Sequence, residues 1–277
     1  MATDADHHHL LPPLRIRSNG AAESEKEPAQ VRSIGFIKHQ RSRYMQRSSA
    51  RSRTARHFAR EFPGVSGCDI RSALRQSPAQ LHQDVFALCA NEFTRDRFFL
   101  DIGASDGVTL SNSILLERGY GWSGIAIEPD PRAAKKFRRG RNCVLVESAV
   151  SGSQSAGTTR LVQAGMLSAL AEDLPIDAHS AKRSKSRRSV EVQLTPLNEI
   201  LERHAAPSRI DFLSLDIEGL EFDVLKTLDW QSWNVRAIAV EHNFRQSEAL
   251  IESFLDGQGF RRVLTSLSDF DGWFVRK

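Results

Sequence analysis

The chain has 277 residues, of which 40% are hydrophobic and 26% charged. This composition is typical of a globular protein with enough apolar material for a core, and it excludes collagen-like and wholly disordered classes. No run reaches the roughly 18 apolar residues of a membrane-spanning helix, so we expect no transmembrane segment. Cys68, Cys89 and Cys143 are too far apart for a disulfide framework or a C-x-x-C metal pair, which favours a reducing, cytoplasmic setting.

The net charge of +4 conceals two regions of opposite sign. Residues 1–75 contain 14 Lys and Arg against 7 Asp and Glu, whereas residues 76–277 contain 24 against 27. Between Val31 and Arg60 there are nine basic residues and no acidic one. Because such a stretch repels itself and buries little apolar surface, we predict a largely disordered basic segment over 1–75 and a folded domain over 76–277.

The basic segment suits a solvated tail, a phosphate-binding arm for nucleic acid, a membrane-surface contact or a targeting segment. No apolar stretch of about 7 to 15 residues lies near Met1, which argues against a secretory signal. A nucleic-acid-binding protein that uses this arm stays an alternative function, although the net negative charge of the folded part disfavours it.

A strand, a glycine turn and a helix open the folded domain. Phe98–Ile102 is a short apolar run, Gly103–Gly107 follows at once, and apolar residues then recur at helical spacing. This order is typical of the start of a Rossmann-like unit. Gly103 can adopt a positive φ and lets a ligand approach the backbone.

A second apolar run, Ser123–Ile127, ends at Glu128 and Pro129. A carboxylate at this strand end lies beside the first glycine turn, where it can accept hydrogen bonds from two ribose hydroxyls. Residues 144–147 are predicted as a third strand. Strand, glycine turn, helix, strand and acid in this order indicate a nucleoside site.

The charge of the turn favours one nucleoside over another. The sequence reads D-x-G-x-x-D-G, whereas a dinucleotide site reads G-x-G-x-x-G and binds a pyrophosphate at this turn. Asp101 and Asp106 therefore put two carboxylates where a pyrophosphate would bind. Two carboxylates suit a ligand with an amino group and a sulfonium, which S-adenosylmethionine has. An NAD(P)-dependent oxidoreductase is the alternative, but neither Tyr44 nor Tyr120 fits a Tyr-x-x-x-Lys motif. Both carboxylates also suit plain turn and capping residues.

A second acidic segment follows a strand in the C-terminal half. Residues 209–216 alternate and deliver Asp216 to a strand end, followed closely by Glu218 and Glu221. The next predicted strand, 236–240, ends at Glu241 and His242, and 260–264 and 272–275 are predicted to close the sheet. Doubly wound sheets bind their ligands at such strand ends.

Four segments together resemble the FkbM-type methyltransferases, which are S-adenosylmethionine-dependent O-methyltransferases. They are FFLDIGASDGVTLSN, GWSGIAIEPDP, VESAVS and IDFLSLDIEGLEFDVL. The resemblance covers about residues 80–245 and implies an α/β, Rossmann-like class I methyltransferase sheet of seven strands with the last antiparallel. It implies a hydroxyl acceptor on a sugar, glycan or secondary metabolite, without naming it.

The resemblance also assigns roles to residues. Asp101 and Gly103 would form the cofactor turn, Glu128 would bind the ribose, and Glu147 or Ser148 would meet the adenine edge. The acidic segment would lie near the methyl group or the acceptor; it comprises Asp216, Glu218 and Glu221. The basic stretch KRSKSRR at 182–188 has no counterpart in the resemblance.

Methyl transfer to a weakly acidic hydroxyl needs a base or a metal. Asp216 and His242 are the candidate bases, and Asp216, Glu241 and His242 are an alternative ligand set for magnesium or manganese. Two plainer interpretations remain. Glu218 and Glu221 suit the first turn of a helix, and His242 suits a hydrogen-bonded loop position.

Overall fold

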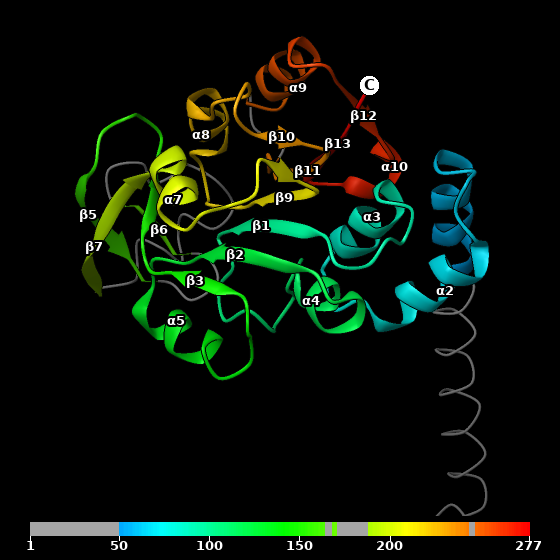
Figure 1. The fold of residues 1–277 in the computed structure, drawn as a ribbon, viewed down its shortest axis with the longest axis horizontal. Coiled ribbons are helices and arrows are strands. Elements are labelled where there is room, and N and C mark those ends of the chain that lie inside the picture. Colours follow the sequence, from blue (N-terminus) through cyan, green and yellow to red (C-terminus); the bar gives the residue numbers. More distant parts are fainter. Residues whose placement is uncertain (1–49, 164–167, 171–187, 244–246) are drawn as a thin grey trace, which may run out of the picture. The chain divides into compact units, whose positions relative to one another are not determined.

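The computed structural model describes residues 50–163, 168–170, 188–243 and 247–277. The described part has a central sheet with helices on both faces (Figure 1). The basic stretch at 182–188 lies outside the described residues except for Arg188. Among the described residues, no helix is both long and apolar enough to cross a membrane.

The central sheet has seven strands in the order β12-β13-β11-β9-β1-β2-β3. All neighbours are parallel except the two pairs that involve β13, the last strand of the chain, which runs antiparallel to β11 and β12. The predicted seven-stranded sheet with an antiparallel last strand is thereby confirmed. Its strands are β1 (Phe98–Ile102), β2 (Ser123–Ile127), β3 (Val144–Val146), β9 (Phe212–Leu215), β11 (Ala237–Glu241), β12 (Phe260–Val263) and β13 (Asp271–Arg276).

Alternation along the strands divides the core between the two faces of the sheet. One face packs on α3 and α4, with Phe99, Phe212 and Trp273 among its buried residues. The opposite face packs on α7, α8 and α9, with Leu100 and Leu213 pointing there. Because each strand is buried on both faces, its sequence is apolar throughout. The helices are α3 (Gln83–Ala90), α4 (Ile114–Tyr120), α5 (Pro131–Phe137), α7 (Leu197–Arg203), α8 (Glu221–Thr227), α9 (Ser247–Gly257) and α10 (Thr265–Ser268).

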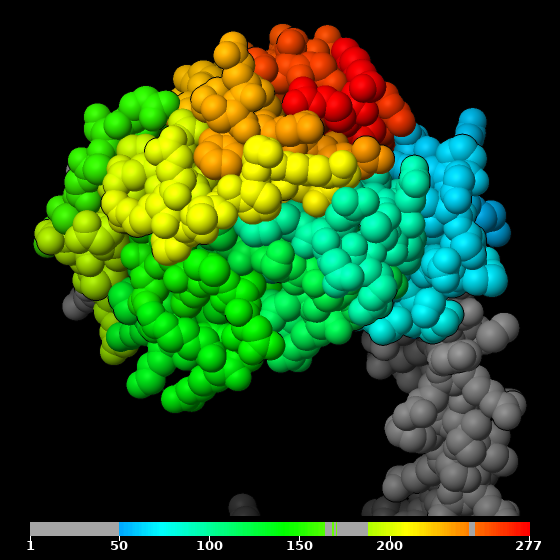
Figure 2. All heavy atoms as spheres, viewed as in Figure 1, coloured from blue at the N-terminus to red at the C-terminus, as the bar shows by residue number. Residues whose placement is uncertain are grey.

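The N-terminal part of the described chain corrects the expected extent of disorder. Residues 50–61 are helical and α2 (Gly67–Gln76) follows, although both lie in the segment expected to be disordered. Phe58 and Ile70 are fully buried in the same cluster as α3, and Phe58 stacks on Trp273 with 6.1 Å between ring centroids. Figure 2 shows the blue surface of these helices continuous with the rest of the unit. Their few apolar residues bury enough surface to outweigh the charge of the stretch.

A second sheet, which the sequence did not reveal, leaves the central one after β3. It has the order β4-β7-β5-β6, and its strands are β4 (Ala149–Ser151), β5 (Gly157–Val162), β6 (Ala169–Leu170) and β7 (Ser189–Pro196). Leu161 and Leu170 are buried on one side of it. A pair of two-residue strands, β8 (Arg209–Ile210) and β10 (Asn234–Val235), completes the strands of the described residues.

Candidate active site

The glycine turn after β1 is fastened to the end of β2. The backbone N–H groups of Gly103 and Ala104 both donate to the carbonyl oxygen of Ile127. The Ser105 N–H donates to the Glu128 carboxylate at 2.7 Å, and the Asp130 N–H donates to its other oxygen at 2.7 Å. Burial raises the pKa of Glu128 to about 7. The carboxylate is therefore held rigidly at the strand end, where the sequence placed it.

Gly103 also touches the end of β9. Its φ is 88°, and a Cβ atom there would lie 1.7 Å from the backbone oxygen of Asp216. The Asp216 N–H donates to the carbonyl oxygen of Ile102 in the neighbouring strand β1. Only glycine allows both the positive φ and this approach. The close contact brings the turn after β1 and the acidic segment after β9 together.

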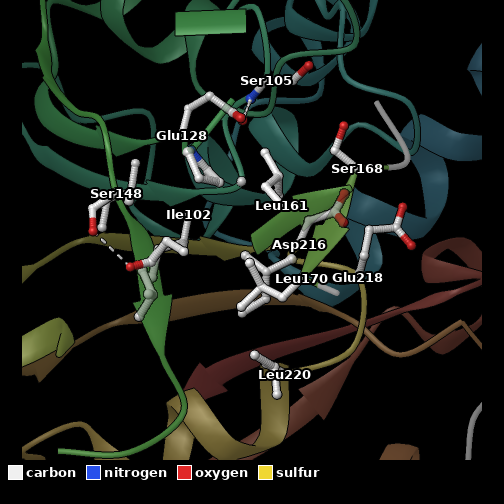
Figure 3. Close-up of a pocket in the computed structure, with 16 residues that line it drawn as sticks. Ile102, Ser105, Glu128, Ser148, Leu161, Ser168, Leu170, Asp216, Glu218 and Leu220 are labelled. Carbon is white, nitrogen blue, oxygen red and sulfur yellow. Dashed lines mark hydrogen bonds between the residues drawn. The ribbon is translucent and has the colours of Figure 1, made fainter. Parts of the chain in front are cut away.

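A first cavity of about 650 Å³ lies where the turn, the end of β2 and the second sheet meet (Figure 3). It has an acidic side with Glu128, Asp216 and Glu218, and an apolar wall from both sheets. We call it the nucleoside cavity. The apolar wall includes Ile102, Ile127, Val150, Leu161, Leu170 and Leu220.

A second cavity, of about 560 Å³, lies against the other side of the turn. It shares Gly103, Ser105 and Asp216 with the nucleoside cavity. The two hollows therefore meet at Asp216. We call the second one the polar cavity, because most of its remaining lining is polar: Gln80, Gln83, Asp101, Thr109, Ser111 and Asn112.

Asp101, the second-to-last residue of β1, lines the polar cavity and is nearly fully buried. Burial raises the pKa of Asp101, against the lowering effect of the Ser113 hydroxyl, which donates to Oδ2 at 2.5 Å, and of the nearby Arg141 guanidinium. Asn112 donates to Ser214 Oγ, and its own Oδ1 has no hydrogen-bond partner among the described residues. The cavity thus offers acceptors to a cationic ligand group.

Two further carboxylates gather around Asp216. Ligand oxygens of Asp216, Glu218 and Glu241 all lie within 4.8 Å of one another, and Figure 3 shows the first two side by side. Asp216 is accessible from the cleft, whereas Glu218 and Glu241 are buried. Burial among protein atoms and the charges of Glu218 and Asp271 raise the pKa of Asp216 well above its ordinary value. We call this set the acidic cluster.

Glu218 reaches the cluster through a strained turn. Its φ is 63°, in the left-handed region that residues other than glycine seldom occupy. Glu221 holds the turn, because its Oε1 accepts the N–H groups of Ile217 at 3.1 Å and Gly219 at 2.9 Å. The helix-start interpretation therefore fits Glu221, the first residue of α8, and not Glu218, which lines the nucleoside cavity.

The structure does not bring Asp106 or Glu147 to either cavity. Asp106 accepts the N–H groups of Val108 and Thr109 and closes the turn, as a capping residue does. Glu147 pairs with Arg138 on the outer side. Ser148, the next residue, does line the nucleoside cavity, with its hydroxyl bonded to Thr195 at 2.8 Å. Successive residues of an extended chain point to opposite sides, which explains the difference.

His242 follows the same rule and faces away from Asp216. Its Nε2 lies 3.2 Å from Arg262 and 3.6 Å from Glu248, and it lines neither cavity. Burial lowers its pKa. The expected base or metal ligand is thus a buried, hydrogen-bonded histidine, while Glu241 before it points to the acidic cluster.

Sequence reasoning also missed several residues that line the cavities. Asn112 gave no motif, although a polar residue just before a helix was a usable signal. Leu161 and Leu170 belong to the second sheet, for which no periodic pattern was recognised. Gln83 lines the polar cavity and donates to Asp271 at 2.9 Å.

A model of one protein family matches most of the folded part of the chain. Residues 101–262, more than half of the chain, match the model of the methyltransferase FkbM domain. The chain belongs to the FkbM methyltransferase family. This membership confirms the resemblance, implies S-adenosylmethionine as methyl donor, and sets aside the oxidoreductase alternative. No curated protein matches the chain.

Comparison with solved structures finds methyltransferases at low sequence identity. The FkbM methyltransferase from Methylobacillus flagellatus KT is 16% identical, with a TM-score of 0.41, over 65% of this chain and 43% of that one. This FkbM chain therefore spans less than half the length of that relative. The precorrin-6y C5,15-methyltransferase from Geobacter metallireducens GS-15 is 13% identical, with a TM-score of 0.39, over 69% of this chain and 85% of that one.

Proposed function

We propose that this FkbM-family chain transfers a methyl group from S-adenosylmethionine to a hydroxyl of a small molecule, such as a sugar, glycan or secondary metabolite. The observation that carries the proposal is the position of Asp216. Its carboxylate lies where the nucleoside cavity and the polar cavity meet, so one acidic group faces both a bound nucleoside and the space beside it.

The residues present fit S-adenosylmethionine. The apolar wall of the nucleoside cavity suits an adenine ring, and the carboxylates on its other side suit the polar groups of a nucleoside. Glu128 has oxygen lone pairs left for ribose hydroxyls, because each of its oxygens accepts one backbone N–H and can accept a second hydrogen bond. The polar cavity would hold the amino-acid end, with Asp101 and Asn112 as acceptors for its ammonium group.

The bound donor supplies an electrophilic methyl group on a positively charged sulfur. Asp216 would accept the hydroxyl proton as the acceptor oxygen forms its bond to the methyl carbon, and the electron pair of the breaking carbon–sulfur bond stays on sulfur. A carboxylate whose pKa is raised is a stronger base, which suits this step. Glu218 would assist by its charge at the same end of the cleft.

Ligand binding and turnover test the proposal separately. S-adenosylmethionine and S-adenosylhomocysteine should raise the melting temperature by mass action, and NAD should not. Incubation of metabolite or glycan extracts with the protein and isotope-labelled S-adenosylmethionine should yield labelled products in which mass spectrometry places the methyl group on oxygen. Stabilisation by NAD alone, or labelling on nitrogen or carbon, would contradict the proposal.

A cytoplasmic location is part of the same proposal. The three cysteines are free, with Cys89 buried, as expected of a chain that folds under reducing conditions. A contact of the basic segment with nucleic acid or a membrane surface stays an open prediction, because residues 1–49 lie outside the described residues. A divalent cation, magnesium or manganese, bound at Asp216 and Glu241 would extend this proposal. The relative positions of the carboxylates are the evidence for it.

A further inference from the structure

Glu241 has a carboxylate oxygen that nothing in the described part of the chain satisfies. The residue is only 8% exposed at the end of β11, yet its Oε2 has no hydrogen-bond partner there. Its surroundings are other acids, since the charges of Asp216, Glu218 and Glu221 all act on it. A buried, unsatisfied carboxylate oxygen costs folding free energy, so it needs a partner that arrives from outside.

The carboxyl groups of Asp216 and Glu241 lie within hydrogen-bonding reach of each other. Two carboxylates attract only when something positive lies between them, either a proton or a cation. No Lys or Arg of the described residues forms an ion pair with either group. The choice of occupant for this position is therefore between a shared proton and a small cation.

The geometry suits a cation. Magnesium and manganese prefer oxygen ligands, and magnesium–oxygen distances are about 2.0–2.1 Å, so ligands on opposite sides of the ion are about 4 Å apart. The ligand oxygens of Asp216, Glu218 and Glu241 lie within 4.8 Å of one another, so small side-chain movements close the set. The strained backbone of Glu218, with φ at 63°, holds its carboxylate in this set.

We propose that Asp216, Glu218 and Glu241 bind one divalent cation, magnesium or manganese, at the junction of the two cavities. The ligand set differs from the one expected from sequence, because Glu218 takes the place of His242. The proposal rests on the proposed function for its role. A cation there would bind the acceptor hydroxyl and lower its pKa, and the proton would pass to the Asp216 oxygen that does not bind the cation.

The test uses the full chain and manganese alone. Titration of Mn²⁺, followed by electron paramagnetic resonance of the free ion, should show one saturable site. Glu241→Gln should weaken that site at least tenfold, because it removes the charge of a buried ligand. Asp223→Asn is the matched control, because Asp223 is a nearby acid that pairs with Lys226 on the exposed side of α8. The Asp223→Asn protein should bind Mn²⁺ as tightly as the unmodified protein does.

Glu218→Gln provides a second variant should Glu241→Gln fail to fold by circular dichroism, and it should weaken Mn²⁺ at least tenfold too. Absence of a saturable site in the unmodified chain, or unchanged Mn²⁺ binding in a folded variant, overturns the proposal. Calorimetry with S-adenosylmethionine separates the two hypotheses. Donor binding without Mn²⁺ binding defeats only the cation site, whereas Mn²⁺ binding without donor binding defeats only the proposed function.

Discussion

Glu128 and Glu241 lie at the carboxyl ends of two parallel strands of the central sheet, β2 and β11, and their carboxylates have opposite surroundings. Both oxygens of Glu128 accept backbone N–H groups at 2.7 Å. Glu241 has one oxygen without a partner in the described chain, and other carboxylates surround it. Burial raises the pKa of both groups. Position in the fold therefore brings an acid to the carboxyl ends of the strands, whereas its hydrogen-bond partners determine what it can bind.

The turn after β1 and the acidic segment after β9 touch at Gly103. Disrupting this contact should have the largest effect of the changes proposed here. Gly103→Ala puts a Cβ where the backbone oxygen of Asp216 lies and demands a positive φ of alanine. We expect a loss of about 2–5 kcal/mol of unfolding free energy, from backbone strain and overpacking together. Urea unfolding measures it.

Gly157→Ala is the matched control for this change, because a Cβ there meets nothing within 4 Å. Its stability should change by no more than about 1 kcal/mol. Equal unfolding midpoints for the two variants would show that the turn after β1 and the end of β9 are not in close contact.

Asp216→Asn tests the acidic end alone. Turnover should fall about 100-fold or more, the scale expected for loss of a general base, while donor affinity stays within a few-fold. Single-turnover rates with a labelled donor and calorimetry measure the two quantities, with Asp223→Asn as the control. Wild-type turnover in the Asp216→Asn protein removes the carboxylate from the chemistry, either as a base or as a cation ligand.

Glu128→Ala tests the satisfied end alone. Donor affinity should fall by about 1.5–3 kcal/mol, the range for hydrogen bonds to a charged group, with the fold retained. Glu147→Ala is the informative partner, because Glu147 pairs with Arg138 outside the cavity. Its affinity should be unchanged in calorimetry. Equal losses in the two variants would restore the sequence-based role of Glu147 at the adenine edge.

The pH dependence of donor binding should show the smallest effect. In the proposed donor complex, ribose hydroxyls would donate to the ionised form of Glu128, whose pKa burial raises to about 7. Donor affinity should therefore rise about tenfold between pH 6 and pH 8, as the ionised fraction rises. Glu128→Gln should abolish this Glu128-dependent rise in calorimetry. A rise that persists in the variant assigns the titration to another group.

The same pKa has a consequence for stability without ligand. A buried acid with a raised pKa binds its proton more tightly in the folded state than in the unfolded one. Its contribution to stability is therefore greatest at low pH and is lost as pH rises from the ordinary value of 4.5 to about 7. In the Glu128→Gln protein, the urea concentration at the unfolding midpoint should depend less on pH over this window than in the unmodified protein.

Sequence patterns predicted the central sheet because each strand is a short apolar run with a clear stop. The runs 98–102 and 123–127 coincide with β1 and β2, and acids or glycines follow them. The acids at strand ends were found for the same reason. The sequence did not predict which way these side chains point. Glu147 and Ser148 are consecutive and point to opposite sides, as do Glu241 and His242.

The N-terminal helices show a different limit of sequence reasoning. Between residues 50 and 76 charge dominates the composition, while Phe58, Ile70 and Leu74 are separate and few. These residues become buried only because they pack against Trp273 and α3, and this packing holds the two helices on the domain. A chain that starts near Ser77, which composition suggested as a domain start, would leave this part of the core uncovered.

Trp273 is connected to the acidic cluster through Asp271, which makes it a candidate optical reporter of the proposed active site. The ring stacks on Phe86 with 5.1 Å between centroids, and its indole N–H donates to Asp271 Oδ2 at 3.3 Å. Asp271 is one of the charges that act on Asp216. A change of charge at Asp216 therefore alters the electric field across the indole, and the emission wavelength of Trp273 follows it. A chain that keeps only this tryptophan would report the state of Asp216 by fluorescence, with no added label.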